Sequence, residues 1–148
     1  MYSFDTKHIK PDQYVHVIAT RNTVRNARIV ENNIFLVSSE DSFLNRHHDH
    51  FQRSMQGSGW AWDADFFDFD NDGFEDLYIA NGREPNLSYN MERNVLYMQF
   101  DGYFYDVSDG SGADFWSNDR GAAYADFDND GDLDIIINNY QSSAVLLR

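Results

Sequence analysis

Two aspartate-rich segments contain the residues whose types and spacing could do chemistry. Residues 68–76 and residues 126–134 both read Asp-x-Asp-x-Asp-Gly-x-x-Asp. Carboxylates at positions 1, 3, 5 and 9 converge on one point if the chain coils tightly around it. The glycine at position 6 permits the left-handed backbone that such a coil needs. The pattern therefore predicts a loop that surrounds a cation.

The predicted ligands of each loop are four aspartate side chains and one backbone carbonyl from position 7. Hard oxygen ligands in this number suit Ca²⁺, which accepts about six to eight of them in a flexible shell, whereas Mg²⁺ demands a stricter octahedron. We therefore expect two calcium sites. The predicted ligands are Asp68, Asp70, Asp72, Phe74 and Asp76 in the first site, and Asp126, Asp128, Asp130, Asp132 and Asp134 in the second.

Two other interpretations of the loops compete with calcium binding. An EF-hand needs a bidentate Glu at position 12 and helices on both sides, but position 12 is Ile79 or Ile137, inside an apolar run. Asp-Asn-Asp-Gly is also ordinary turn chemistry, so a solvated acidic turn explains one such loop. It does not explain four carboxylates at the same spacing twice, because these groups would repel one another without a cation.

The loops belong to a longer repeat with an offset of 58 residues. After each loop comes an apolar run that leads to Asn, at residues 77–81 and 135–138, and further upstream residues 33–37 resemble residues 94–98. These segments are short, rich in β-branched and aromatic residues, and separated by Gly, Asn, Asp and Ser. That pattern predicts strands and turns, with a hairpin turn at Asp101-Gly102, and hence an all-β fold of tandem repeats.

The repeat divides the chain into four predicted parts. Residues 33–93 and residues 94–143 are two repeats, and residues 144–148 begin another that is truncated or completed by a partner. Residues 1–32 form an N-terminal segment with one strand-like run, or a partial repeat. Incomplete repeats leave unpaired strand edges. Three explanations fit them: a fragment of a larger propeller, self-association into a ring or filament, or pairing with another β-repeat chain.

Composition excludes several classes of function. The chain of 148 residues has no Cys and a formal net charge of −14; residues 59–148 carry four Lys or Arg and nineteen Asp or Glu, a net charge of −15. Phosphate binding needs a basic face, so nucleic acid is excluded as a partner, and cations or a basic protein surface are favoured. No apolar run approaches the ~20 residues of a membrane span.

The loop, the strand after it and the strand before it recur in an order that resembles the calcium-loop repeats of the FG-GAP/VCBS family, which also occur in integrin α-subunit propellers. The resemblance covers roughly residues 33–148. It implies that the four aspartates of each loop are calcium ligands and that the strands form β-propeller blades. It also implies an extracellular or cell-surface location and a role in adhesion or recognition. A closed propeller needs at least about four blades, whereas this chain has two repeats.

Three weaker features complete the sequence. His48 and His50 would share a face of a strand and suit zinc, but without a third ligand a polar loop is the simpler interpretation. Asn86 begins an Asn-Leu-Ser sequon, an acceptor for N-glycosylation if the protein is exported. Trp60, Trp62 and Trp116 are expected mainly in the core, although an exposed Trp would offer a platform for sugar rings.

No nucleophile motif, phosphate loop or dinucleotide fingerprint occurs in the chain. The paired carboxylates could serve as the acid and base of a glycosidase, but a cation explains their spacing better. We therefore predict a non-enzymatic, calcium-stabilised all-β module for structural assembly or adhesion. The alternative is a lectin-like module that recognises a glycan or a protein.

Overall fold

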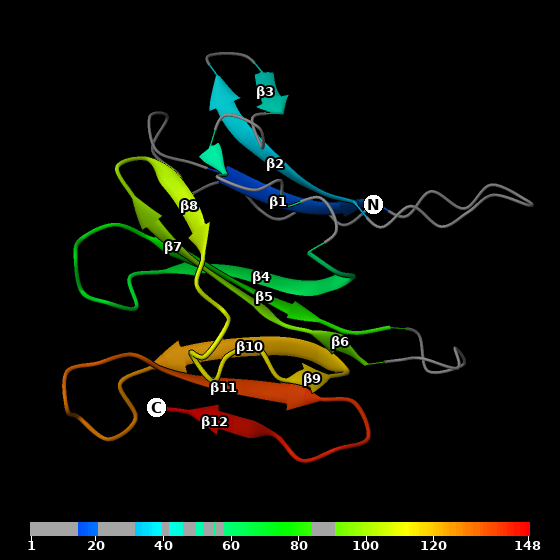
Figure 1. Ribbon diagram of the computed structural model, residues 1–148, viewed down its shortest axis with the longest axis vertical. Helices are drawn as coiled ribbons and strands as arrows, with labels where there is room; N and C mark the ends of the chain where they lie inside the picture. The colour runs from blue at the N-terminus through cyan, green and yellow to red at the C-terminus, as the bar shows by residue number, and fades with distance from the viewer. Residues whose placement is uncertain are drawn as a thin grey trace, which may run out of the picture.

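The computed structural model describes residues 15–20, 32–39, 42–45, 50–51, 55, 58–83 and 91–148. Within the first three strands, the side chains described are those of Asn33 and Ser42. All pairings between the strands of its sheets are antiparallel, which confirms the predicted all-β fold. In this described part, the sheets lie in an open row (Figure 1) and do not close into a barrel or a propeller.

Three sheets follow one another along the chain and down the long axis of the molecule (Figure 1). The N-terminal sheet contains β1 (Val15–Thr20), β2 (Asn32–Ser39) and β3 (Ser42–Asn45). The central sheet contains β4 (Ala61–Phe67), β5 (Asp76–Asn81), β7 (Val95–Phe100) and β8 (Tyr103–Asp106). The C-terminal sheet contains β10 (Asp119–Ala125), β11 (Asp134–Asn139) and β12 (Val145–Leu147). A ribbon of β6 (Glu92–Arg93) and β9 (Trp116–Ser117) lies beside the last two sheets.

The sequence repeat and the sheets are out of phase. The boundary between residues 93 and 94 falls inside the central sheet, after β5 and before β7. Residues 94–143 therefore supply β7 and β8 to the central sheet, and β10 and β11 to the C-terminal sheet. Each sequence repeat thus ties two neighbouring sheets together through the chain.

Burial on both faces distinguishes β5, because all six of its residues are buried. Successive side chains of a strand point to opposite faces. Leu77 and Ile79 join the hydrophobic cluster on the N-terminal side of the central sheet, whereas Tyr78 and Ala80 join the cluster on its C-terminal side. The central sheet is therefore the middle layer of the packing.

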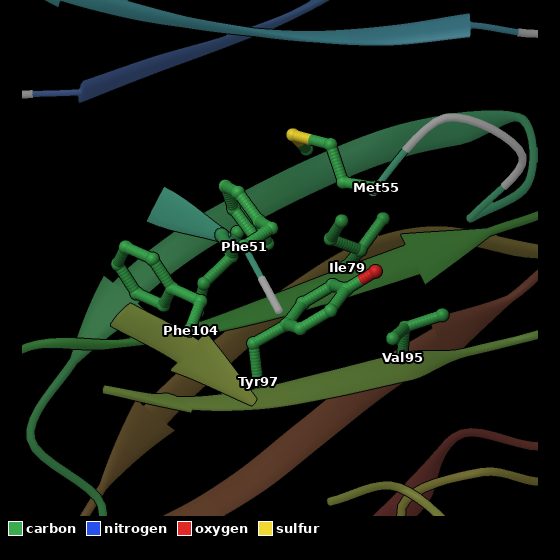
Figure 2. Packing of buried hydrophobic residues seen from close by; sticks show 7 residues of the cluster. Phe51, Met55, Ile79, Val95, Tyr97 and Phe104 are labelled. Carbon is green, nitrogen blue, oxygen red and sulfur yellow. The ribbon is translucent and has the colours of Figure 1, made fainter. Parts of the chain in front are cut away.

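Two residues outside the sheets, Phe51 and Met55, cover the N-terminal side of the central sheet. Figure 2 shows both lying over β5, on the side from which β1 and β2 approach. The Phe51 ring stacks on the Phe104 ring at 4.9 Å between centroids and meets the Tyr97 ring edge-on at 5.1 Å. Burial of these apolar side chains stabilises the fold by roughly 25 cal/mol per Å² of surface removed from water.

The central and C-terminal sheets pack directly on each other. Ile135 and Ile137 of β11 are buried against Tyr78 and its neighbours in the central sheet. Two polar contacts align the two sheets. The backbone N–H of Ala122 donates to the Asp63 carboxylate at 2.9 Å, and the Tyr124 hydroxyl donates to the Phe66 carbonyl at 3.0 Å.

Turn and bulge geometry follows the sequence closely. Asp101 and Gly102 connect β7 to β8 with φ angles of 49° and 79°, as in the two-residue Asp-Gly hairpin turn that sequence predicts. The first strand of each of the last two sheets carries a bulge, at Trp62 in β4 and at Arg120 in β10. These two residues are 58 positions apart, so the bulge belongs to the repeat.

Adjacent residues of β11 provide a test of the packing. Ile137 is fully buried, and Ile136 is 40% exposed on the opposite face. We expect Ile137→Ala to lower the free energy of unfolding by about 2–5 kcal/mol, because it leaves a cavity between the sheets. Ile136→Ala should cost well under that, on the order of 0.5 kcal/mol. Urea unfolding of dilute protein measures both, and equal losses would contradict this assignment of faces.

Candidate metal centre

Both acidic loops lie on the same side of the sheet stack. The first loop joins β4 to β5, and the second joins β10 to β11, so each connects the first two strands of its sheet (Figure 1). The strands before and after each loop pair directly with each other, from Phe67 with Asp76 and from Ala125 with Asp134. Each loop is therefore held at both ends by one antiparallel pair.

The backbone of the two loops has the same unusual conformation. Gly73 and Gly131 have φ angles of 91° and 100°, so the predicted left-handed glycine at position 6 is confirmed. Asn71 and Asn129, at position 4, are also left-handed, with φ angles of 59° and 63°. Asn adopts this region more readily than most residues, so its recurrence at position 4 was a signal that sequence reasoning did not use.

The carboxylate at position 1 organises each loop by accepting two backbone hydrogen bonds. Asp68 accepts from the N–H groups of Asp72 and Gly73, both at 2.9 Å. Asp126 accepts from the equivalent N–H groups of Asp130 and Gly131, both at 3.1 Å. The coil around position 1 is therefore built into each loop by the chain itself.

The carboxylate at position 9 closes each loop onto its own start. Asp76 accepts from the N–H of Phe69 at 3.1 Å, and Asp134 accepts from the N–H of Phe127 at 3.0 Å. In the first loop the other oxygen of Asp76 accepts from the N–H of Gln99 at 2.7 Å. Asp76 thereby links the loop to β7 as well as to β4.

The structure brings together three of the four predicted carboxylates in each loop. Ligand oxygens of Asp68, Asp70 and Asp76 lie within 4.8 Å of one another, and so do oxygens of Asp126, Asp128 and Asp130. Asp72 and Asp134 are outside these groups. The first loop therefore groups positions 1, 3 and 9, and the second groups positions 1, 3 and 5. Hydrogen bonding does not explain this difference, because position 5 accepts from the N–H of position 7 and position 9 closes the loop in both.

This set of donors fits a hard divalent cation. All the grouped atoms are carboxylate oxygens. The residues of position 7, Phe74 and Asp132, directly follow the left-handed glycines. Carboxylate and carbonyl oxygens in flexible loops are the ligands that Ca²⁺ takes. Nitrogen or sulfur donors, which zinc and copper favour, are missing from the two groups.

The two loops also touch each other. The Asn71 side-chain amide donates to the Gly131 carbonyl and to the Asp132 carboxylate, both at 3.3 Å. Arg148, at the end of β12, lies 3.5 Å from the Asp128 carboxylate. The acidic side of the stack is thus a single surface to which the central and C-terminal sheets both contribute.

Burial perturbs the acid at position 9 of the first loop. Asp76 is fully buried, and this desolvation raises its pKa to about 6. The N–H groups of Gln99 and Phe69 lower the pKa, and the nearby carboxylates of Asp70 and Asp72 raise it again. Burial likewise raises the pKa of Asp65 to about 6, with help from the charge of Asp63. Keeping these acids ionised therefore costs free energy in the absence of a cation.

Several other predicted residues have less to do with the loops. His47, His48 and Asn86 lie outside the described residues, and the Nδ1 atom of His50 is 3.0 Å from the Gly102 carbonyl oxygen. The expectation that the Trp residues lie mainly in the core is wrong for Trp116, which is 65% exposed, and Trp62 is 37% exposed. Trp116 is outside because the residues before and after it, Phe115 and Ser117, take the inward positions.

The sequence analysis missed a group of arginine and aromatic side chains on the opposite side of the stack. Arg120, bulged out of β10, places its guanidinium 4.2 Å from the centre of the Trp62 ring and 5.0 Å from that of Tyr140. Arg93 of β6 pairs with Asp114 at 3.1 Å, directly across from Trp116. The sequence analysis offered no signal for this site, because the bulges that carry Trp62 and Arg120 emerge only from the strand register.

Comparison of the chain with protein-family models, with curated proteins and with solved structures found no match. The resemblance to the FG-GAP/VCBS repeats therefore stays a prediction from the residues. Among the described residues, no helix is both long and apolar enough to cross a membrane.

The raised pKa values predict how stability depends on pH in the presence of a chelator. The folded state holds protons on Asp76 and Asp65 up to about pH 6, whereas the unfolded chain releases them near the ordinary aspartate pKa of 3.8. The stabilisation is complete below the unfolded pKa and is lost as pH rises through about 6, so the free energy of unfolding should fall between about pH 4 and pH 7.

Urea unfolding in chelator across this range measures the effect. Asp76→Asn should weaken the pH dependence, because its amide does not titrate, while Asp101→Asn at an exposed hairpin should leave it intact. An unchanged pH profile in Asp76→Asn would show that this acid is not the source.

Proposed function

We propose that this protein is a calcium-stabilised β-repeat module with a structural role in assembly or adhesion outside the cell. The observation that carries the proposal is the agreement between the two loops. Position 1 accepts the same two N–H groups, position 9 accepts the same one, and three carboxylates gather in each. A solvated turn has no need of this acidic geometry twice.

Calcium would act on the fold by holding neighbouring strands at the loop end. The first loop is tied to β4, β5 and β7 through Asp76, and it touches the second loop through Asn71. An ion bound only by the folded state stabilises that state by mass action. Binding would also offset the repulsion among grouped carboxylates in a protein of net charge −14.

The sheets support the blade interpretation within this proposal. A propeller blade is a four-stranded antiparallel sheet, and the central sheet has the order β4-β5-β7-β8. We propose that the central and C-terminal sheets are two blades, that further blades come from another chain or another copy, and that calcium fixes the blade geometry. Extracellular placement fits weak sites, with Kd values of roughly 10⁻⁴–10⁻³ M.

Titration of the intact protein with Ca²⁺ tests the proposal. Calorimetry should show two ions bound per chain, and at about 100 times Kd each bound ion should add about 2.7 kcal/mol to the free energy of unfolding. Asp68→Asn and Asp126→Asn should each remove one ion, because each removes the charge at position 1. Asp109→Asn, at an exposed acid outside the loops, should remove none.

The competing interpretation of the loops makes the opposite prediction. Solvated acidic turns would give no saturable binding, and the three variants would behave alike. Equal affinity for Mg²⁺ and Ca²⁺ would also count against the proposal, because a flexible loop of this kind should favour the larger ion.

Sugar recognition is the second candidate function, and a specific observation favours it. Trp116 is 65% exposed, and the Arg93–Asp114 ion pair lies beside it on the β6–β9 ribbon. An exposed indole offers an apolar face to a sugar ring, and a paired guanidinium and carboxylate offer donors and acceptors to its hydroxyls.

A glycan array probed with the intact protein tests this second function. If sugars bind, Trp116→Ala should weaken the binding by at least about tenfold, equivalent to about 1.4 kcal/mol. Phe100→Ala is the matched control, since Phe100 is equally exposed but lies at the β7 end of a hairpin. Equal effects of the two variants, or no bound glycan, would remove this candidate.

A further inference from the structure

Asn71 of the first acidic loop is placed to act on the second loop. Its side-chain amide donates to the Gly131 carbonyl and to the Asp132 carboxylate, both at 3.3 Å. Gly131 and Asp132 are positions 6 and 7 of the second loop, and the carbonyl of position 7 is one of the predicted ligands. The contact therefore reaches the segment of the second loop that is expected to supply its backbone ligand.

The peptide group between Gly131 and Asp132 is held from both sides. Its carbonyl accepts from Asn71 of the first loop, and its N–H donates to the Asp130 carboxylate of its own loop at 3.0 Å. The equivalent N–H of the first loop donates within that loop in the same way. Among the described residues, however, the equivalent carbonyl, that of Gly73, accepts no hydrogen bond. The first loop thus helps to orient the second.

Within the first loop, Asn71 is fixed by the acids beside it in the chain. The N–H of Asp72 donates to Asp68 at 2.9 Å and to Asp70 at 3.2 Å. Oxygens of Asp68 and Asp70 belong to the group that could hold an ion. An ion that restrains these two carboxylates therefore also restrains the backbone that carries Asn71.

The contact runs in one direction, although the repeat supplies the same residue to both loops. Asn129 occupies position 4 of the second loop, is exposed like Asn71, and has a similar φ angle of 63° against 59°. In the part of the chain that the structure describes, the Asn129 side chain makes no hydrogen bond to the first loop. Asn129 is therefore a matched control for Asn71.

We infer that Asn71 couples the two loops, so that an ion bound in either loop strengthens binding in the other. The inference rests on the proposed calcium binding and adds a regulation of the same sites. The two hydrogen bonds form best when both loops hold their ion-binding conformation, and an ion in either loop favours that conformation. Coupling between sites is reciprocal and typically changes affinity by about 5- to 150-fold. Because this contact is exposed, we expect about fivefold, the lower end of that range.

Calcium titrations followed by NMR test the inference, because the backbone N–H signals of Gly73 and Gly131 report the filling of each loop separately. The salt concentration is about 0.15 M, which screens repulsion between the ions. Asn71→Gly keeps the left-handed backbone and changes no charge. It should raise the calcium concentration that half-fills the second loop by about fivefold. In an Asp68→Asn background, whose first loop is disabled, it should have little effect. Asn129→Gly should leave the filling of the first loop unchanged.

A measurement that needs no variant of Asn71 accompanies these titrations. In Asp68→Asn, the side-chain amide signals of Asn71 should shift as the second loop fills, because its two acceptors belong to that loop. An absence of this shift would overturn the inference.

The remaining outcomes separate the coupling from calcium binding itself. Equal effects of Asn71→Gly in both backgrounds would show that Asn71 only shapes the second loop, and no effect in either would show that the loops are independent. Both results would overturn the inference while the parent still bound two ions, so the proposed function would stand. A parent protein that bound no calcium would overturn the proposed function, and this inference with it.

Discussion

Burial of β5 on both faces is the constraint on which the rest of the structure depends. A strand between two packed layers must present apolar side chains to both, and Leu77 to Ala80 do so. Polar residues are therefore confined to its two ends, Asp76 and Asn81, where both are still buried. Each buried polar group must then find partners, because an unsatisfied one costs roughly 1–3 kcal/mol. These partners define the two sides of the sheet stack, one at each end of β5.

At one end, Asp76 meets this requirement through the acidic loop. Its oxygens accept backbone N–H groups from the loop and from β7, so the same carboxylate that the sequence marks as a ligand also joins two strands. Asp76 lies close to the carboxylates of Asp68 and Asp70, and the proposed cation would offset the repulsion among them. Structure and proposed metal binding thus share one residue.

At the other end, Asn81 and Asn94 begin a buried polar network between the sheets. Asn94 accepts from the N–H of Asn81 at 2.8 Å and donates to Asp119 at 2.5 Å. Ser117 donates to the same Asp119 oxygen. Among the residues that the structure describes, the other oxygen of Asp119 and the Asn81 side-chain oxygen have no hydrogen-bond partner. Burial accordingly raises the pKa of Asp119. Three of the four basic residues in residues 59–148, Arg83, Arg93 and Arg120, lie at this end, opposite the aspartates.

Local structure could be predicted from the sequence because it depends on neighbours along the chain. The Asp-x-Asp-x-Asp-Gly pattern predicted the left-handed turns at Gly73 and Gly131, and Asp-Gly predicted the β7–β8 hairpin. Short runs of β-branched and aromatic residues between turn residues predicted strands. The 58-residue offset likewise predicted that both loops would be built alike. Cation binding and the closure of the repeats into blades stay predictions. The first depends on an ion and the second on further sheets, and neither follows from the local pattern of residues.

Long-range packing decided what the sequence could not. Only the stacking of sheets determines that Tyr78 is buried while its counterpart Ile136 is exposed, since both are large apolar residues at the same repeat position. It likewise places Trp116 outside and divides each sequence repeat between two sheets. A pattern along one strand specifies which residues share a face, but the layer that covers this face comes from residues distant in the chain.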